Sequence, residues 1–270
     1  MPLFSRDGLV FHYRDEGAGL PFVFQHGLGG DTSQPFGLFT PPAGIRLLSL
    51  DCRGHGETRP LGDPDKLSYA AFADDVCALL DHLELPQVIL GGISMGAGVA
   101  LNLALRFPRR VRGLVLSRPA ALDQPLPPNA AVFPQIAELI GRHGAQAGLQ
   151  IFKRSDLYRE LAATAPDVAR SLCGQFEHPR AEETAVKLAR IPQTSPIPDM
   201  AALASITVPA LVLANRQDPV HPFEYGEILA RALPQAELKE LTSKSVSVEQ
   251  HLQQTQRYIE QFLTQGRSLP

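Results

Sequence analysis

Hydrophobic residues along this chain of 270 residues form short runs that alternate with segments of helical periodicity. The runs are typical of buried strands and cover residues 20–25, 45–50, 87–91 and 111–116, with a weaker, alternating run at 9–13. Between them, residues 69–83 repeat apolar side chains at helical spacing, and residues 97–107 are small and aliphatic. This alternation predicts an α/β fold with a mostly parallel sheet and helices on both faces.

The pattern changes after Ser117. From position 118 to about 206 the strand signals disappear, prolines become frequent, and helical patches follow at 136–151, 167–176 and 180–190. Strand-type runs return at 208–214 and 237–241, with helical segments at 225–233 and 249–263. We therefore predict a core formed by residues 1–117 and 207–270, with about eight strands, and a helical insertion of residues 118–206 that lies over the sheet as a lid.

A serine between two glycines follows the run at 87–91, in the stretch Gly92-Ile93-Ser94-Met95-Gly96. At a tight strand-to-helix turn, such a serine projects its hydroxyl from a strained backbone, and glycines leave room for the neighbouring elements. The same turn directs the backbone N–H of Met95 toward an anion forming at Ser94. A turn with an incidental serine is the alternative, but the strand before it and the helix after it favour a nucleophile.

Other polar residues also follow predicted strands. They are His26, the segment 51–55, Arg118, Asp218 and Lys244. Because ligands bind beyond the carboxyl ends of strands in an open parallel sheet, we expect these residues to surround one site together with Ser94.

The order of three motifs resembles the α/β-hydrolase superfamily: His-Gly-x-Gly-Gly at 26–30, Asp-x-Arg-Gly-His-Gly at 51–56, and Gly-x-Ser-x-Gly at 92–96. The resemblance covers nearly the whole chain. It implies that Ser94 is a nucleophile, that the backbone N–H groups of Leu28 and Met95 form an oxyanion hole, and that Asp218 is the acid of a triad.

The histidine of such a triad is missing from its usual place. The family usually carries Gly-His after the last strand, where this chain has Ser243-Lys244. Three residues are alternatives for the base: His251, which we favour if the final helix begins late; His221, just beyond Asp218; and Lys244 itself, if it is desolvated near another cation.

Two cations are expected near the oxyanion hole. Arg118 follows a strand that ends at the site, and Lys244 lies in the loop where the histidine is expected. Such a pair favours a substrate with a carboxylate or phosphate. The alternative for Arg118 is an ion pair that ties the insertion to the sheet.

Composition narrows the class of protein. The formal net charge of −3 gives no reason to expect nucleic acid or an anionic membrane as a partner, and no apolar run is long enough for a membrane span. Three widely spaced cysteines suit free thiols in the cytoplasm, and no metal-ligand pattern or cofactor motif is present. We expect a small-molecule substrate and no metal or cofactor, and we leave open whether the chain forms a homo-oligomer.

The sequence thus predicts a carboxylesterase-like serine hydrolase, which cleaves an ester or similar acyl bond of a small molecule through an acyl-enzyme on Ser94. Two alternatives remain. One is a non-catalytic binding protein or degenerate enzyme on the same fold. The other is cofactor-free lyase or oxygenase chemistry, in which the oxyanion hole stabilises an enolate without acylation.

Overall fold

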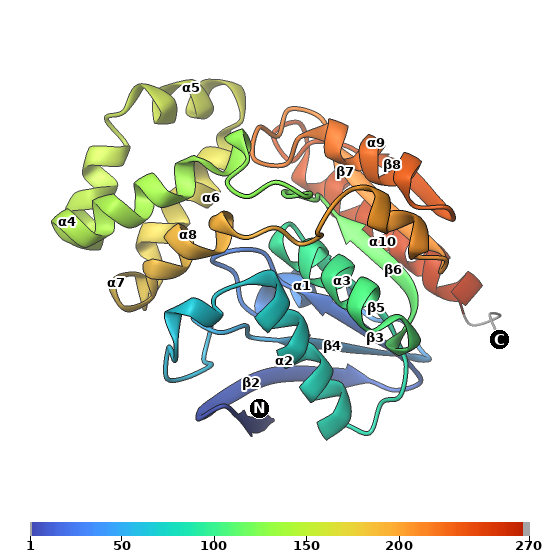
Figure 1. Ribbon diagram of the computed structural model, residues 1–270. Coiled ribbons are helices and arrows are strands. Elements are labelled where there is room, and N and C mark those ends of the chain that lie inside the picture. Colours follow the sequence, from blue (N-terminus) through green and yellow to red (C-terminus); the bar gives the residue numbers. More distant parts are fainter. Residues whose placement is uncertain (1, 267–270) are drawn as a thin grey trace.

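Eight strands form one sheet in the computed structural model, which describes residues 2–266 (Figure 1). Their bounds are β1 Leu3–Arg6, β2 Leu9–Gly17, β3 Leu20–Gln25, β4 Ile45–Leu50, β5 Val88–Ile93, β6 Val111–Ser117, β7 Ala210–Asn215 and β8 Ala236–Leu241. The strand order is β1-β2-β4-β3-β5-β6-β7-β8, and only β2 runs antiparallel to its neighbours. The predicted α/β class and mostly parallel eight-stranded sheet are confirmed.

Helices cover both faces of this sheet. On one face lie α2 Tyr69–His82, α3 Met95–Arg106 and α9 Phe223–Ala232; on the other lie α1 Ser33–Leu38 and α10 Val248–Gly266. The central strand β5 is buried along its whole length, as its apolar sequence requires when helices cover both faces. On α10, the side chains of His251, Thr255, Ile259 and Leu263 are buried at a spacing of four residues, so this stripe faces the sheet.

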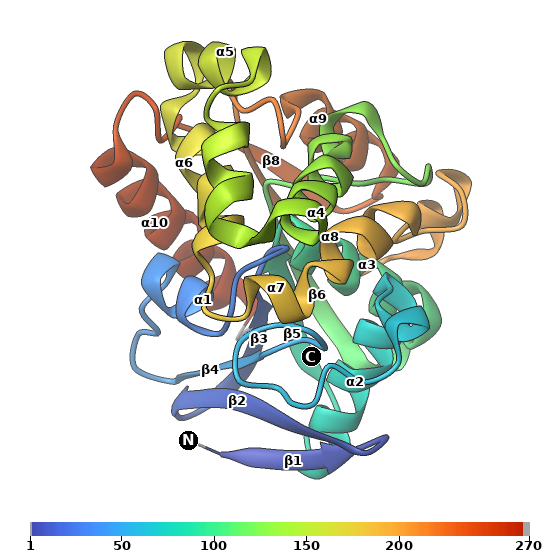
Figure 2. The same cartoon turned by 90° about the vertical axis from the view of Figure 1, so that its left-hand side faces the viewer.

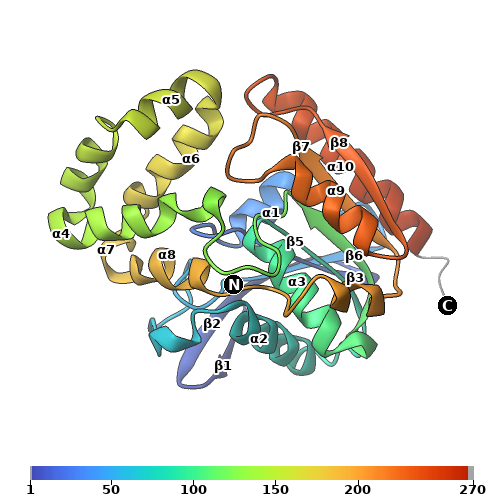
Figure 3. The same ribbon diagram turned by 45° about the horizontal axis from the view of Figure 1, so that its top comes forward.

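The helical insertion stands beside one end of the sheet (Figures 1 and 2). Its helices are α4 Val132–Phe152, α5 Asp156–Thr164, α6 Pro166–Glu177, α7 Ala181–Thr184 and α8 Val186–Arg190. They bury a hydrophobic cluster of their own, which includes Ile136, Leu172 and Phe176, separate from the two clusters on the faces of the sheet. Figure 3 shows the same helices as a separate layer beyond the strands.

Two cationic side chains join this insertion to the core. Arg180 donates from Nη1 to the carbonyl oxygens of Gly56 and Thr58, both at 2.9 Å, and Lys187 donates from Nζ to Gly54 O at 2.9 Å. Both side chains are buried, so these charge-assisted bonds lie largely out of water. The insertion is therefore tied to the loop that follows β4.

Local detail differs from the sequence prediction in a few places. The structure adds β1, α1 and α5, and five short 3₁₀ segments at Pro64–Lys66, Pro108–Arg110, Pro128–Ala130, Ile191–Gln193 and Ala201–Ser205. The last part of the predicted insertion packs with the core, because Ile197, Leu203 and Ile206 join the cluster on the face of α2 and α3. Within residues 2–266 no helix combines the length and apolar character that crossing a membrane requires.

Candidate active site

Ser94 lies at the turn between β5 and α3. Its backbone has φ of 57° and ψ of −112°, a conformation that is strained for a residue with a side chain. Its N–H donates to Ser117 O on the neighbouring strand β6 at 2.9 Å, which holds the turn against the sheet. The predicted strand, turn and helix around this serine are therefore present.

The glycines that flank Ser94 are required by close packing. A Cβ atom on Gly92 would lie 2.2 Å from the carbonyl carbon of Gly96, and one on Gly96 would lie 2.4 Å from the carbonyl oxygen of Gln25. Both distances are far below van der Waals contact, so a side chain at either position would force β3, β5 and α3 apart. The motif thus encodes the tight approach of these three elements.

Two backbone N–H groups are available beside this serine. Met95 is the first residue of α3, and Leu28 lies in the glycine-rich loop between β3 and α1. Neither N–H donates a hydrogen bond to another group within residues 2–266. Leu28 and Ser94 line one cavity, and Leu28, Ser94 and Met95 line a second. Free N–H groups beside a nucleophile are one requirement of an oxyanion hole.

The carboxylate of Asp218 pairs with His221. The Nδ1 atom of His221 lies 2.9 Å from both carboxylate oxygens of Asp218, and the His221 backbone N–H donates to Oδ1 at 3.1 Å. The two residues lie three positions apart in the loop between β7 and α9, where the chain turns back on itself and also joins His221 N–H to Asp218 O. A tight turn between Asp218 and His221 thus brings the two side chains together.

Asp218 remains ionised over the ordinary pH range. Burial alone would raise the pKa of this carboxyl, but contacts with His221 and the charge of Arg118 hold the pKa below its usual value. Arg118 reaches Asp218 Oδ2 from Nη1 at 3.4 Å, so Arg118 pairs with the candidate acid of the triad. An ion pair that joins Arg118, at the start of the predicted insertion, to the core is the alternative given for this residue, and the structure contains it.

The predicted pairing of Asp218 with His251 is corrected by the structure. Helix α10 begins at Val248, three residues before His251, and so turns the His251 ring toward the sheet. Its Nδ1 is 2.9 Å from Thr242 O, its Nε2 is buried without a hydrogen-bond partner among the described residues, and it does not line the cavity at Ser94. Burial and the charge of Arg118 lower the pKa of His251 to about 4, so the ring is neutral.

Lys244 enters the cavity from the loop between β8 and α10. Its ammonium makes no hydrogen bond or ion pair with any residue in the described part of the chain, although the neighbouring Ser245 hydroxyl bonds to Asp167 of α6. Burial, together with the charge of Arg118, lowers the pKa of Lys244 to about 8. The site therefore holds a cation that lacks a partner.

Several of these groups line one cavity of about 130 Å³. From the core it is lined by Leu28, Ser94, Arg118, His221 and Lys244; from the insertion it is lined by Phe133, Asp167, Ser171, Leu172 and Gln175. A smaller, mostly apolar space of about 30 Å³ adjoins Ser94 on the side of Met95 and Tyr69. Ser94, Arg118 and Lys244 thus line one cavity, as predicted, and Asp218 bonds to His221 of the same lining. His26 and residues 51–55, also predicted to surround the site, do not line this cavity and are buried in the core.

The Ser94 hydroxyl makes no hydrogen bond to His221 in this state, nor to any other residue of 2–266, although both line the same cavity. Such bonds are often long or poorly aligned in an enzyme without its substrate. Among the same residues, no group of three or more His, Cys, Asp or Glu side chains is placed to hold a metal ion.

Comparison with known proteins agrees with this fold. A profile of the alpha/beta hydrolase fold family matches residues 21–245. 3-Oxoadipate enol-lactonase 2 of Acinetobacter baylyi is 26% identical over 254 residues, which cover 88% of this chain and 92% of the relative. 2-Hydroxymuconate semialdehyde hydrolase of Pseudomonas putida is 27% identical over 283 residues, covering 99% and 97%. The crystal structure of the enol-lactonase from Burkholderia xenovorans superposes with a TM-score of 0.73 at 25% identity, covering 97% of this chain and 100% of that one.

The chain belongs to the α/β-hydrolase family. The relatives just described carry hydrolase and lactonase names, and both classes act on ester-like or similar bonds of small molecules. The prediction of an enzyme of hydrolase type is confirmed at this level. The roles of individual residues are taken up next.

Proposed function

We propose that this protein hydrolyses an ester or lactone bond of a small anionic molecule, through an acyl-enzyme on Ser94. The observation that supports this most strongly is the turn at Ser94: a strained serine lines a cavity beside two backbone N–H groups that have no hydrogen-bond partner within residues 2–266. The names of the relatives, which include an enol-lactonase, support the choice of bond.

In the proposed mechanism, His221 is the general base and Asp218 orients it. The bond between His221 Nδ1 and the Asp218 carboxylate places the proton of the neutral ring on Nδ1 and leaves Nε2 to accept the proton of Ser94. The transfer occurs directly after a small movement in the loaded enzyme, or through one water. Ser94 Oγ then attacks the carbonyl carbon, and the oxyanion accepts hydrogen bonds from Leu28 N–H and Met95 N–H. His221 returns the proton to the leaving group, and a water activated by His221 releases the acid.

In this proposal, Arg118 and Lys244 bind the negatively charged group of the substrate. Arg118 uses one donor on Asp218 at 3.4 Å, and Lys244 has no described partner, so both have hydrogen-bond donors left for a carboxylate or phosphate. The helical insertion then acts as the lid, because Phe133, Leu172 and Gln175 line the same cavity as Ser94. A cytoplasmic location is part of the proposal, and the three buried free cysteines fit it.

The experiment compares two serines of the same cavity. Ser94→Ala removes the proposed nucleophile, and Ser171→Ala removes another hydroxyl that lines the cavity from the insertion. With a panel of small esters and lactones, each with and without a carboxylate, we expect Ser94→Ala to lower kcat by about 10⁴-fold or more and Ser171→Ala by less than about tenfold. Full turnover by Ser94→Ala would reject acylation and favour chemistry on an enolate in the same oxyanion hole.

A further inference from the structure

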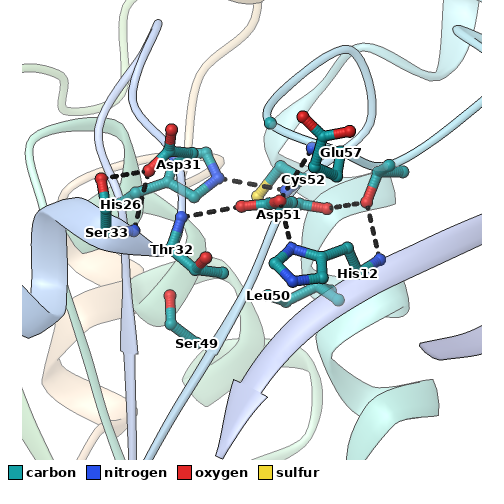
Figure 4. Close-up of polar contacts among 12 residues, drawn as sticks. His12, His26, Asp31, Thr32, Ser33, Ser49, Leu50, Asp51, Cys52 and Glu57 are labelled. Atoms are coloured by element: carbon teal, nitrogen blue, oxygen red, sulfur yellow. Dashed lines mark hydrogen bonds and ion pairs between the residues drawn. The ribbon is translucent and has the colours of Figure 1, made fainter. Parts of the chain in front are cut away.

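A buried carboxylate outside the proposed chemistry holds the loop that carries Leu28. Asp51 follows β4 and is 1% exposed. Its Oδ1 accepts the backbone N–H of Thr32 at 2.7 Å, and its Oδ2 accepts the backbone N–H of Glu57 at 2.9 Å. His12 of β2 lies against the same carboxylate, with Nδ1 at 2.6 Å from Oδ2 (Figure 4). Asp51 thus joins three segments that are distant in the sequence.

The next residue holds the other end of the same loop. We call residues 26–32 the oxyanion loop. The backbone N–H of Cys52 donates to Nε2 of His26 at 3.1 Å (Figure 4). The Nδ1 atom of His26 lies 2.8 Å from Gly27 O. Burial lowers the pKa of His26, so the ring is neutral and carries its proton on Nδ1. Asp51 and Cys52 therefore fix the last and the first residue of the oxyanion loop.

The oxyanion loop has one internal backbone hydrogen bond, from Gly30 N–H to Gly27 O at 3.0 Å, and is rich in glycine. Three of its seven residues are glycines (Gly27, Gly29 and Gly30), and Gly29 has φ of 76°. Glycine permits many backbone conformations, so the position of Leu28 N–H depends on outside contacts. Besides those of residues 51 and 52, these include Gln34 Oε1 on Gly27 N–H at 2.7 Å and a long bond of 3.4 Å from Gln175 to Leu28 O. The backbone N–H groups of Ser33 and Gln34 also donate to Asp31, at 2.7 and 3.1 Å.

We propose that Asp51 is a positioning residue for the oxyanion hole: with the support of His12, it sets the direction of the Leu28 N–H. This inference rests on the proposed function, because it assigns Leu28 N–H to the transition state. An N–H donor stabilises the oxyanion only if it lies within hydrogen-bond distance of where the charge develops, and a displacement of about 1 Å can cost about 100-fold in rate. Loss of the Asp51 contact should therefore lower kcat more than it raises KM.

The chain offers a matched control in Asp75. This carboxylate on α2 is also 1% exposed, and it pairs with Arg53 at 2.6 and 2.7 Å, so it stabilises the same loop after β4. None of its hydrogen bonds or ion pairs within residues 2–266 reaches the oxyanion loop. If the role of Asp51 were purely structural, replacing Asp51 or Asp75 by asparagine would change kcat to the same extent.

The experiment compares Asp51→Asn with Asp75→Asn on an ester that the native enzyme hydrolyses. Three readouts are measured: kcat and KM, the inhibition constant of an alkyl boronic acid (a tetrahedral analogue of the intermediate), and the melting temperature. For Asp51→Asn we expect kcat to fall about 10- to 100-fold with KM within about threefold, and boronate binding to weaken in step with kcat/KM. For Asp75→Asn we expect a lower melting temperature, with kcat per folded enzyme within about twofold. Equal losses of kcat in the two variants would overturn the proposal.

A second pair of variants keeps the test valid if Asp51→Asn does not fold. His12→Leu removes the donor to Asp51, whereas His12→Gln can keep one. We expect His12→Leu to lower kcat and to weaken boronate binding. In His12→Gln, kcat and boronate affinity should both lie between those of His12→Leu and the native enzyme. Identical kcat values for the two variants and the native enzyme would reject the role of His12.

Failure of the inference can be told from failure of the proposed function. An inactive Ser94→Ala variant together with native kcat in Asp51→Asn contradicts the positioning role alone. A fully active Ser94→Ala variant contradicts the serine mechanism, and the positioning role falls with it.

Discussion

The two halves of the candidate site are built in different ways. The nucleophile half consists of the loops after β3 and β5, and it works through backbone groups: the strained turn at Ser94 and the N–H groups of Leu28 and Met95. The acid–base half consists of the loops after β6, β7 and β8, and it works through the side chains of Arg118, His221, Asp218 and Lys244. The first half could be predicted from short motifs, and the second could be predicted only in part.

The reason lies in how each half is encoded. A backbone turn needs glycine at fixed positions, because any Cβ at Gly92 or Gly96 would clash, so the motif is local and visible in the sequence. The side chain that pairs with a carboxylate depends on the three-dimensional fold. His221 meets Asp218 through a turn of four residues, whereas His251 is turned away because α10 begins at Val248. A signal was present: His251 opens a buried stripe with Thr255, Ile259 and Leu263.

The largest effects on this comparison are expected when His221 and His251 are replaced one at a time. We expect His221→Gln to lower kcat/KM by about 10³- to 10⁴-fold, and Asp218→Asn by a similar factor, because each leaves Ser94 without an oriented base. His251→Gln should leave kcat/KM within about threefold, because this side chain does not line the cavity. The measurement is steady-state ester hydrolysis, and a large loss in His251→Gln with native activity in His221→Gln would reverse our assignment.

A second test concerns the cations. Lys244→Met removes a charge that has no described partner, so we expect KM for an anionic ester to rise about 10- to 100-fold while KM for its neutral methyl ester stays within about twofold. Arg118→Ala should also raise KM for the anionic ester, but it should lower kcat for both, since Arg118 contacts Asp218 as well. Lys153→Met, a change on the exposed part of the insertion, serves as the control. An unchanged preference for anionic over neutral esters in both site variants would reject the anionic substrate.

The pH dependence of substrate binding gives a finer test of the acid–base half of the site. Burial and Arg118 lower the pKa of Lys244 to about 8, so its positive charge is present below this pH and is lost above it. We expect KM for an anionic ester to rise as the pH increases through about 8, and KM for the neutral ester to stay level. Lys244→Met should abolish the rise; a rise of the same size in Lys244→Met would assign the titration to another group.

The smallest effect is expected for His251, and it concerns stability. Its pKa is lowered to about 4 in the folded state, against about 6.5 for an unperturbed histidine. Between these values the unfolded chain binds more protons, so the free energy of unfolding should decrease as the pH falls from about 6.5 to 4, by at most about 1.4 kcal/mol per pH unit for this group. His251→Gln should show a shallower decrease of melting temperature with pH. His26, His55 and His178, whose pKa values burial also lowers, contribute to the slope that remains.

The fold was predictable for similar reasons. Buried parallel strands such as β5 and amphipathic helices such as α2 carry their own hydrophobic patterns, and both appear close to the predicted positions. The edge strand β1 and the polar helix α5 were not predicted, because each buries few side chains and leaves a weak pattern. The sequence prediction extended the insertion to about 206, whereas Ile197 and Leu203 already pack against the core, which no local signal records.

The central claim is that the hydroxyl of Ser94 is an activated nucleophile. The most direct measurement treats the enzyme with a small alkyl fluorophosphonate and locates the added mass by peptide mass spectrometry. We predict one adduct per chain, on the peptide that contains Ser94, formed at least about 100-fold more slowly in His221→Gln than in the native enzyme. An unmodified Ser94 under conditions that label a known serine esterase completely, or labelling that is equally fast in His221→Gln, would contradict the account.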